Sequence, residues 1–157
     1  QREKRHKTMK ILATKTNNGM RWYYGLKLHI IIEPSGSIIN ARITTASTYD
    51  TVGHKMFLST YPNSIYIGDK GYLSKKNSEI ASRYNSLIYT PLRKNMKCYS
   101  ITNKDQQRYK SIRKKVETTF SLLKTRYNLV STLPRSLNGY LSHYIRSIFM
   151  CQINKNL

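Results

Sequence analysis

Two carboxylates, those of Asp69 and Glu117, are the side chains of this sequence best suited to chemistry. Asp69 follows the apolar run 64–67, which is typical of a buried strand, and α/β folds place ligands at the carboxyl ends of such strands. Glu117 lies in a long segment of helical period, on the flank of its apolar stripe. Carboxylates from a strand end and a later helix can converge on divalent metal ions, which prefer hard oxygen ligands. Two such ions support an in-line phosphoryl transfer.

Each carboxylate also has a plainer interpretation. Asp and Gly both favour turns, so Gly68-Asp69 fits a simple turn. Glu117 stands four residues after Arg113, the spacing of an ion pair on a wet helix surface. Taken singly, each acid fits the plainer interpretation better, and only their combination indicates a metal site.

Several basic side chains are candidates for contacts with phosphate. Lys27 and His29 alternate to one face of a predicted strand, and Lys70 neighbours Asp69. The other candidates lie in the loop before the Glu117 helix or on that helix. The full set of DNA-binding candidates is Lys27, His29, Lys70, Arg93, Lys94, Lys97 and Arg113. A surface lysine, a half-buried histidine or a solvated basic loop would give the same pattern. Tyr72 fits a base-stacking role and a core role equally.

The charge balance indicates a polyanionic partner. The sequence has 28 Lys and Arg against 7 Asp and Glu, a formal charge of +21, and the basic residues occur along its whole length. Nucleic acid fits, because lysines and arginines release its counterions. A solvated basic surface and a ribosomal-type RNA-binding protein remain alternatives.

Composition predicts a globular, cytoplasmic protein. The hydrophobic fraction is 39% and there are 13 tyrosines, which disordered tails lack. No apolar run approaches the length of a membrane span, and no secretory signal is recognisable. Cys98 and Cys151 are isolated, so neither a zinc site nor a disulfide framework is indicated. The chain starts with Gln1, from which we expect a beginning inside a longer protein.

The first half of the sequence predicts an arm, a hairpin and a helix. Residues 1–20 are polar and basic without a sustained period, which predicts an irregular arm. Segments 22–33 and 37–45 are rich in aromatic and β-branched residues around Pro34-Ser35-Gly36, which predicts a β-hairpin. A helix is then expected before Pro62, with Thr48 or Asp50 as its N-cap.

The second half alternates strands and helices. A short strand at 64–67, a helix opened by Ser74 and a strand at 87–89 predict crossover connections and parallel pairing. A long helix starts at Asp105 after the basic loop 91–104. A last helix follows Pro134, with an apolar stripe that implies burial against the body or against another chain. The residues of that stripe are Leu137, Leu141, Tyr144, Ile145, Ile148 and Phe149.

Four segments together resemble the bacterial insertion-sequence DDE transposases. They occur in that family's order, and the resemblance covers roughly residues 20–130. The segments are Tyr24-Gly25-Leu26-Lys27-Leu28-His29, Thr45-Ala46-Ser47-Thr48-Tyr49-Asp50, Ile67-Gly68-Asp69-Lys70-Gly71-Tyr72 and Arg113-Lys114-Lys115-Val116-Glu117-Thr118-Thr119-Phe120.

The resemblance implies a fold, a reaction and a set of partners. It implies an α/β, RNase H-like mixed sheet flanked by helices, with Asp69 matching the second catalytic Asp and Glu117 the catalytic Glu. The implied cofactors are two magnesium or manganese ions. The implied partner is double-stranded DNA, at transposon ends and target, with a homodimer possible. Alternatively, the chain is a non-catalytic basic nucleic-acid-binding protein.

The sequence departs from the family at the first catalytic Asp. That residue is expected on a strand before the hairpin, yet residues 1–20 contain a single acid, Glu3, and no Asp. Asp50 is a poor substitute, because capping explains it and because the family-like block has an acid there in addition to the catalytic three. We therefore expect an N-terminally truncated fragment, inactive alone, whose sheet lacks its first strand and splits into two halves with open edges. Its expected parts are the arm 1–20, a partial catalytic domain 21–130 and a packed C-terminal helix 131–157.

Overall fold

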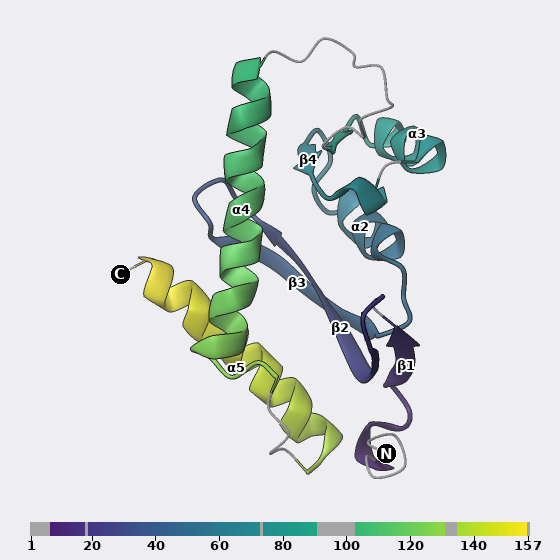
Figure 1. The fold of residues 1–157 in the computed structure, drawn as a ribbon, viewed down its shortest axis with the longest axis vertical. Helices are drawn as coiled ribbons and strands as arrows, with labels where there is room; N and C mark the ends of the chain where they lie inside the picture. Colours follow the sequence, from purple (N-terminus) through teal and green to yellow (C-terminus); the bar gives the residue numbers. More distant parts are fainter. Residues whose placement is uncertain (1–6, 18, 73, 91–102, 131–134, 157) are drawn as a thin grey trace. The chain divides into compact units, whose positions relative to one another are not determined.

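A computed structural model of the 157-residue chain describes residues 7–17, 19–72, 74–90, 103–130 and 135–156. The chain forms two compact units. The first unit comprises Gln1–Thr48 and Val116–Leu157, and the second unit comprises Tyr49–Lys115. The long helix α4 (Asn103–Thr125) contributes its first half to the second unit and its second half to the first (Figure 1).

The first unit contains a three-stranded antiparallel sheet in the order β1-β2-β3. Its strands are β1 (Thr14–Asn17), β2 (Trp22–Ile32) and β3 (Ile38–Thr45). β2 and β3 run side by side (Figure 1), and Gly36 turns the chain between them with a φ of 98°. The predicted hairpin is confirmed, with a register irregularity at Ile31/Ile32.

The strand β1 corrects the expectation of an irregular arm. Residues 14–17 pair with the first four residues of β2, and the short 3-10 helix η1 (Lys7–Met9) precedes them. The Thr14 hydroxyl also accepts a hydrogen bond from the Ser47 amide at 2.9 Å. The local sequence Thr-Lys-Thr-Asn has little strand signal of its own, so pairing with β2 decides its conformation. A strand therefore precedes the hairpin, and it carries no acid.

Helix α5 (Leu137–Asn156) and the second half of α4 build the core of the first unit. Leu123, Leu129 and Cys151 are buried together, against Leu28 of β2 and Ile38 of β3. A second cluster joins Tyr140 to residues that precede and begin the sheet; it comprises Met9, Ala13, Tyr24, Leu26, Leu137, Tyr140 and Tyr144.

The apolar stripe expected on the last helix is only partly buried. Tyr140, Ser147 and Cys151 form the buried face of α5, whereas Ile145 and Phe149 are exposed. Apolar residues of α5 recur at steps of three and four along two sides of the helix. One side packs into the core clusters with the sheet, and the other, with Ile145 and Phe149, is exposed.

The second unit alternates short strands and helices. It contains α2 (Asp50–Leu58), β4 (Ile65–Ile67), the 3-10 helix η2 (Lys70–Tyr72), α3 (Lys75–Arg83) and β5 (Leu87–Tyr89), followed by the first half of α4. β4 and β5 are parallel, with Ile65 opposite Leu87. The predicted crossover and parallel pairing are confirmed.

Two asparagines with left-handed backbone fix where the parallel strands begin. Asn63 and Asn85 have φ values of 55° and 51°, and the Asn85 side-chain amide donates to the Asn63 side-chain oxygen at 2.8 Å. Ser86 Oγ accepts from the Ser64 amide at 3.2 Å. Asn tolerates this conformation better than most residues. The two strand starts are thus tied directly to each other.

The helix starts were predicted with mixed success. Ser74 caps α3 as expected, because its hydroxyl accepts from the Asn77 amide at 3.1 Å. For α2 the expectation was wrong: the N-cap is Tyr49, with no side-chain capping bond, and Asp50 is the first helical residue. A carboxylate there interacts favourably with the helix dipole, but capping does not explain Asp50.

The described elements form a mixed α/β fold with one antiparallel and one parallel sheet, compatible with the RNase H-like class. The predicted α/β fold class is confirmed, and the described strands form two separate sheets.

Candidate active site

Asp69 stands just beyond the carboxyl end of β4. The Gly68 amide donates to the Tyr89 carbonyl at 2.9 Å, which extends the strand pairing by one residue, and the Tyr72 amide then donates to the Asp69 carbonyl at 3.0 Å. The Asp69 side chain is 71% exposed. The sheet therefore ends where this carboxylate enters solvent, as the sequence predicted.

Close packing of the Tyr72 ring explains why the residue before Asp69 is a glycine, Gly68. A Cβ on Gly68 would lie 2.9 Å from Cδ2 of Tyr72, closer than real Cβ contacts allow. The Tyr72 ring thus rests on the backbone at position 68. This contact explains the spacing of Gly68, Asp69 and Tyr72 better than a preference for turns.

Asp69 is paired with Arg113 of α4. The distance from Arg113 Nη1 to Asp69 Oδ1 is 3.5 Å, and the arginine side chain is 36% exposed. Tyr109, one helical turn before Arg113, packs on Tyr89 of β5 with ring centroids 4.1 Å apart. This ring contact fixes α4 against the strand and so positions the guanidinium.

Tyr72 lies close to two carboxylates. Burial, together with the negative charges of Asp50 and Asp69, raises the pKa of Tyr72 to about 12. Asp50, interpreted from the sequence as a capping residue, therefore shares the electrostatic surroundings of Asp69. Tyr72 itself is half-buried.

His54 of α2 is buried beneath this region. Its ring lies edge-on to Tyr66 at 4.8 Å and to Tyr72 at 5.9 Å between centroids. Neither ring nitrogen has a hydrogen-bond partner among the residues that the structure describes. Burial, followed by the charge of Lys55, lowers the pKa of His54. His54 was not among the site residues predicted from the sequence, although a histidine on the inward face of a predicted helix was a usable signal.

Glu117 belongs to the first unit, where its side chain is exposed on α4. It follows Arg113 by four residues of the same helix, about one turn. Asp69 belongs to the second unit.

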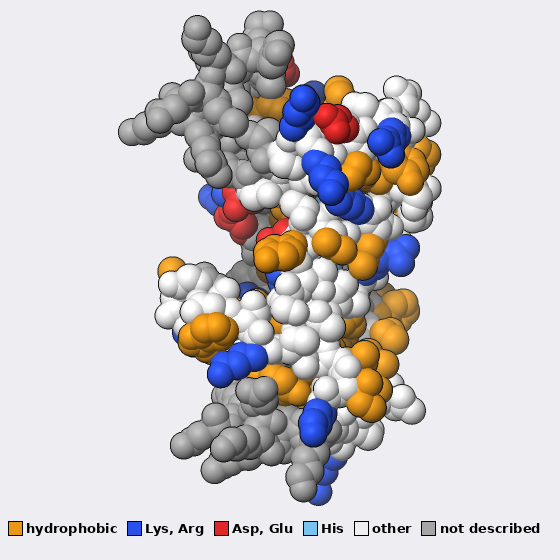
Figure 2. Space-filling view, turned by 90° about the vertical axis from the view of Figure 1, so that its right-hand side faces the viewer, with side chains coloured by type: hydrophobic (Ala, Val, Ile, Leu, Met, Phe, Trp, Pro, Cys, Tyr) orange, Lys and Arg blue, Asp and Glu red, His pale blue; other side chains and the backbone are white. Residues whose placement is uncertain are grey.

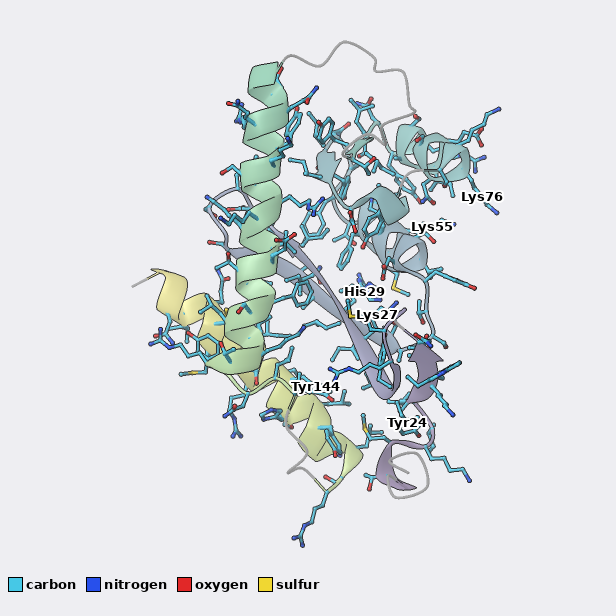
Figure 3. All side chains as sticks on the ribbon, in the orientation of Figure 1. Tyr24, Lys27, His29, Lys55, Lys76 and Tyr144 are labelled. Atoms are coloured by element: carbon cyan, nitrogen blue, oxygen red, sulfur yellow. The ribbon has the colours of Figure 1, made fainter. Side chains whose placement is uncertain are left out.

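Lys27 and His29 follow one another on the same face of β2 (Figure 3). Lys27 Nζ donates to the Thr48 carbonyl at 2.6 Å, and it is half-buried. His29 is buried, with Nε2 2.9 Å from the Thr44 hydroxyl. Both polar groups thus have partners inside the first unit.

The remaining candidates are less completely described. Arg93, Lys94 and Lys97 lie outside the described residues, and for Lys70 the structure describes the backbone alone. On the face shown in Figure 2, Lys and Arg side chains are spread out and do not merge into one patch.

A family model described as "Transposase DDE domain" matches residues 1–137, most of the chain. The chain belongs to the transposase DDE domain family. Comparisons with curated proteins and with solved structures give no match. As a transposase DDE domain, the chain belongs to an enzyme family of DNA transposition whose partner is DNA.

The DDE domain holds no group of three or more His, Cys, Asp or Glu side chains arranged for a metal within its described residues. The carboxylate oxygens of Asp69 nevertheless suit a hard divalent cation, being exposed at a strand end. The described helices include none with the length and apolar character needed to cross a membrane.

Proposed function

We propose that this DDE domain uses Asp69 and Glu117 to hold divalent metal ions, Mg²⁺ or Mn²⁺, for cleavage and joining of DNA strands at insertion-sequence ends. The observation that carries the proposal is the ion pair between Asp69 and Arg113. It ties the strand-end carboxylate to the helix that bears Glu117 one turn later. When bound, such ions activate the attacking oxygen and stabilise the leaving oxygen.

The chain's own residues have three tasks in this proposal. Asp69 and Glu117 supply anionic oxygen ligands, and Arg113 orients Asp69 until substrate phosphate offers the guanidinium a second anionic partner. The basic candidates bind the DNA backbone; they are Lys27, His29, Lys70, Arg93, Lys94, Lys97 and Arg113. Lys27 would have to exchange its bond to the Thr48 carbonyl for a phosphate.

The first of the three carboxylates of a DDE site has no counterpart in the N-terminal part of this chain. The sequence has no acid from Lys4 to Ile32, so β1 and the strand that follows it cannot supply the first Asp of a DDE site. Two acids are fewer than the resemblance implies. We therefore expect little strand cleavage by this chain alone, and recovery when a segment with a strand-borne Asp is joined to it.

Paramagnetic Mn²⁺ gives the direct test. In NMR spectra of the full chain, Mn²⁺ should broaden the amide signals of residues 69 and 117 together. Asp69→Asn should abolish the broadening at both positions, and Glu117→Gln should weaken it. Matched controls are Asp105→Asn and Glu79→Gln, which remove acids outside the proposed site. Broadening at one position without the other would rule out a shared metal site.

The alternative is a basic nucleic-acid-binding protein without catalysis. The ion pair with Arg113 favours this alternative, because it gives the Asp69 carboxylate a structural role that needs no metal. Under this alternative, Asp69→Asn changes neither Mn²⁺ response nor DNA binding. A Mg²⁺-dependent nicking assay of the chain joined to a strand-borne Asp separates the two, since continued inactivity supports the alternative.

A further inference from the structure

The tip of the β1–β2 hairpin presents two large apolar side chains to solvent. Met20 is 94% exposed and Trp22 is 65% exposed. The tip is shaped by Gly19, whose φ of +87° favours glycine and whose amide donates to Asn17 Oδ1 at 2.7 Å. Single exposed apolar residues are ordinary, but a tryptophan and a methionine two residues apart at a defined turn form a patch.

One end of this hairpin is anchored and the other is open. Lys15 pairs with Tyr24 and Asn17 with Trp22, so these four side chains share a face of the hairpin. Tyr24 packs into the buried cluster around Tyr140 (Figure 3 shows Tyr24 near the start of β2). Trp22, two residues nearer the tip, projects beyond that cluster. The paired strand β2 therefore carries the indole into solvent.

Cations flank the exposed indole. Lys15 Nζ lies 5.3 Å from the Trp22 ring centroid, over one face of the ring. Arg21 adjoins Trp22 in the sequence and is exposed. The sequence contains no Asp or Glu from Lys4 to Ile32. A partner for this patch must therefore combine flat apolar groups with closely spaced negative charge.

We infer that the hairpin tip binds single-stranded DNA, with an unpaired base stacked on Trp22 and the flanking phosphates held by Lys15 and Arg21. Single-strand binding sites combine these two elements, an aromatic platform and a cationic track. Lys15 lies over one face of the indole, and since Trp22 is 65% exposed, the base would stack on the opposite face. This inference rests on DNA being the partner of the proposed function, but it does not involve Asp69, Glu117 or a metal.

The sole tryptophan of the chain makes the test direct. The full chain is titrated with a single-stranded oligothymidine of about 15 nucleotides in EDTA, and Trp22 fluorescence is followed. We expect saturable quenching, with weaker affinity for a duplex of equal length. By fluorescence anisotropy of a labelled strand, Trp22→Ala should weaken binding roughly 5- to 150-fold, the contribution of one stacked base, and Trp22→Tyr should retain most of the affinity.

Charge variants and matched controls separate stacking from general attraction. Lys15→Ala and Arg21→Ala should each reduce the slope of log affinity against log salt by about 0.7. Phe149→Ala removes an aromatic side chain of similar exposure, 62%, from α5 and should leave the affinity unchanged. Circular dichroism confirms that each variant is folded.

Three results would overturn the inference. The first is binding of the strand without quenching, and the second is equal affinity of the Trp22→Ala and Phe149→Ala variants. The third is a blue shift of Trp22 on anionic phospholipid vesicles that excess oligonucleotide does not reverse. Failure of the metal proposal looks different: strand binding and quenching persist in EDTA, while Mn²⁺ leaves residues 69 and 117 unaffected.

Discussion

Arg113 and Asp69, 44 residues apart in the sequence, form an ion pair of 3.5 Å within the second unit. The arginine comes from α4 and the aspartate from the loop after β4. The pair is partly open to water, so its value lies in orientation more than in stability.

The first prediction concerns that pair. Arg113→Gln should change the free energy of unfolding by less than about 1 kcal/mol, because water and salt screen exposed ion pairs. Urea denaturation measures this, with Arg108→Gln, an exposed arginine one turn and a half earlier on α4, as the control. A loss above about 2 kcal/mol would show a pair much less solvated than described.

The second prediction concerns the phenol of Tyr72. Its pKa of about 12 should fall in Asp50→Asn and in Asp69→Asn, since each neutralises a charge that disfavours the phenolate. NMR of tyrosine labelled with ¹³C at Cζ, assigned with Tyr72→Phe, follows this titration. Glu79→Gln should leave it unchanged. If Asp50→Asn has no effect, Asp50 does not belong to the surroundings of the site.

The third prediction concerns acid sensitivity. Burial lowers the pKa of His54 in the folded chain below its ordinary 6.5, so the unfolded chain binds the proton more readily. The stability contributed by the neutral ring is present above pH 6.5 and is lost as the pH falls from 6.5 through the lower folded value. His54→Phe should remove this loss, as seen in urea denaturation between pH 7.5 and 5.

His143 supplies the control for that experiment. Its Nε2 lies 2.7 Å from the Asn128 carbonyl, whereas His54 has no such partner within the described part of the chain. His143→Phe should keep the acid sensitivity of the parent chain. Equal pH profiles for His54→Phe and the parent would show that His54 finds a proton acceptor.

The fourth prediction tests the core of the first unit. Leu123 is fully buried between α5 and the sheet, and Leu123→Ala should cost about 2–5 kcal/mol of unfolding free energy, through lost burial and the cavity left behind. Leu87→Ala, at a position 64% exposed, should cost less than about 1 kcal/mol. Similar losses for both leucines would contradict the packing described.

The sequence predicted elements whose period or punctuation is local. The strand 87–89 was placed to the residue, and the hairpin around Gly36 and the helix capped by Ser74 were also recognised. In each case a turn residue, a cap or a run of β-branched residues lies within the element itself.

Elements that depend on distant partners were missed. β1 exists because β2 pairs with it, and the exposed side of α5 reflects how much surface the sheet can cover. The pairing of Arg113 with Asp69 was missed for the same reason, since helical spacing offered Glu117 as the nearer partner. His54 and Tyr72 meet through packing that no local pattern records.

The hydrogen bond between Asn63 and Asn85 fixes where the two parallel strands begin, and so sets how many residues lead from the start of β4 to Asp69. Five residues lie between Asn63 and Asp69, and successive residues of a strand point to opposite faces. A one-residue deletion within β4 would turn the residues after it to the opposite side of the strand, although the carboxylate would remain in the sequence. The number of residues between Asn63 and Asp69 is therefore constrained, as well as the identity of these two residues.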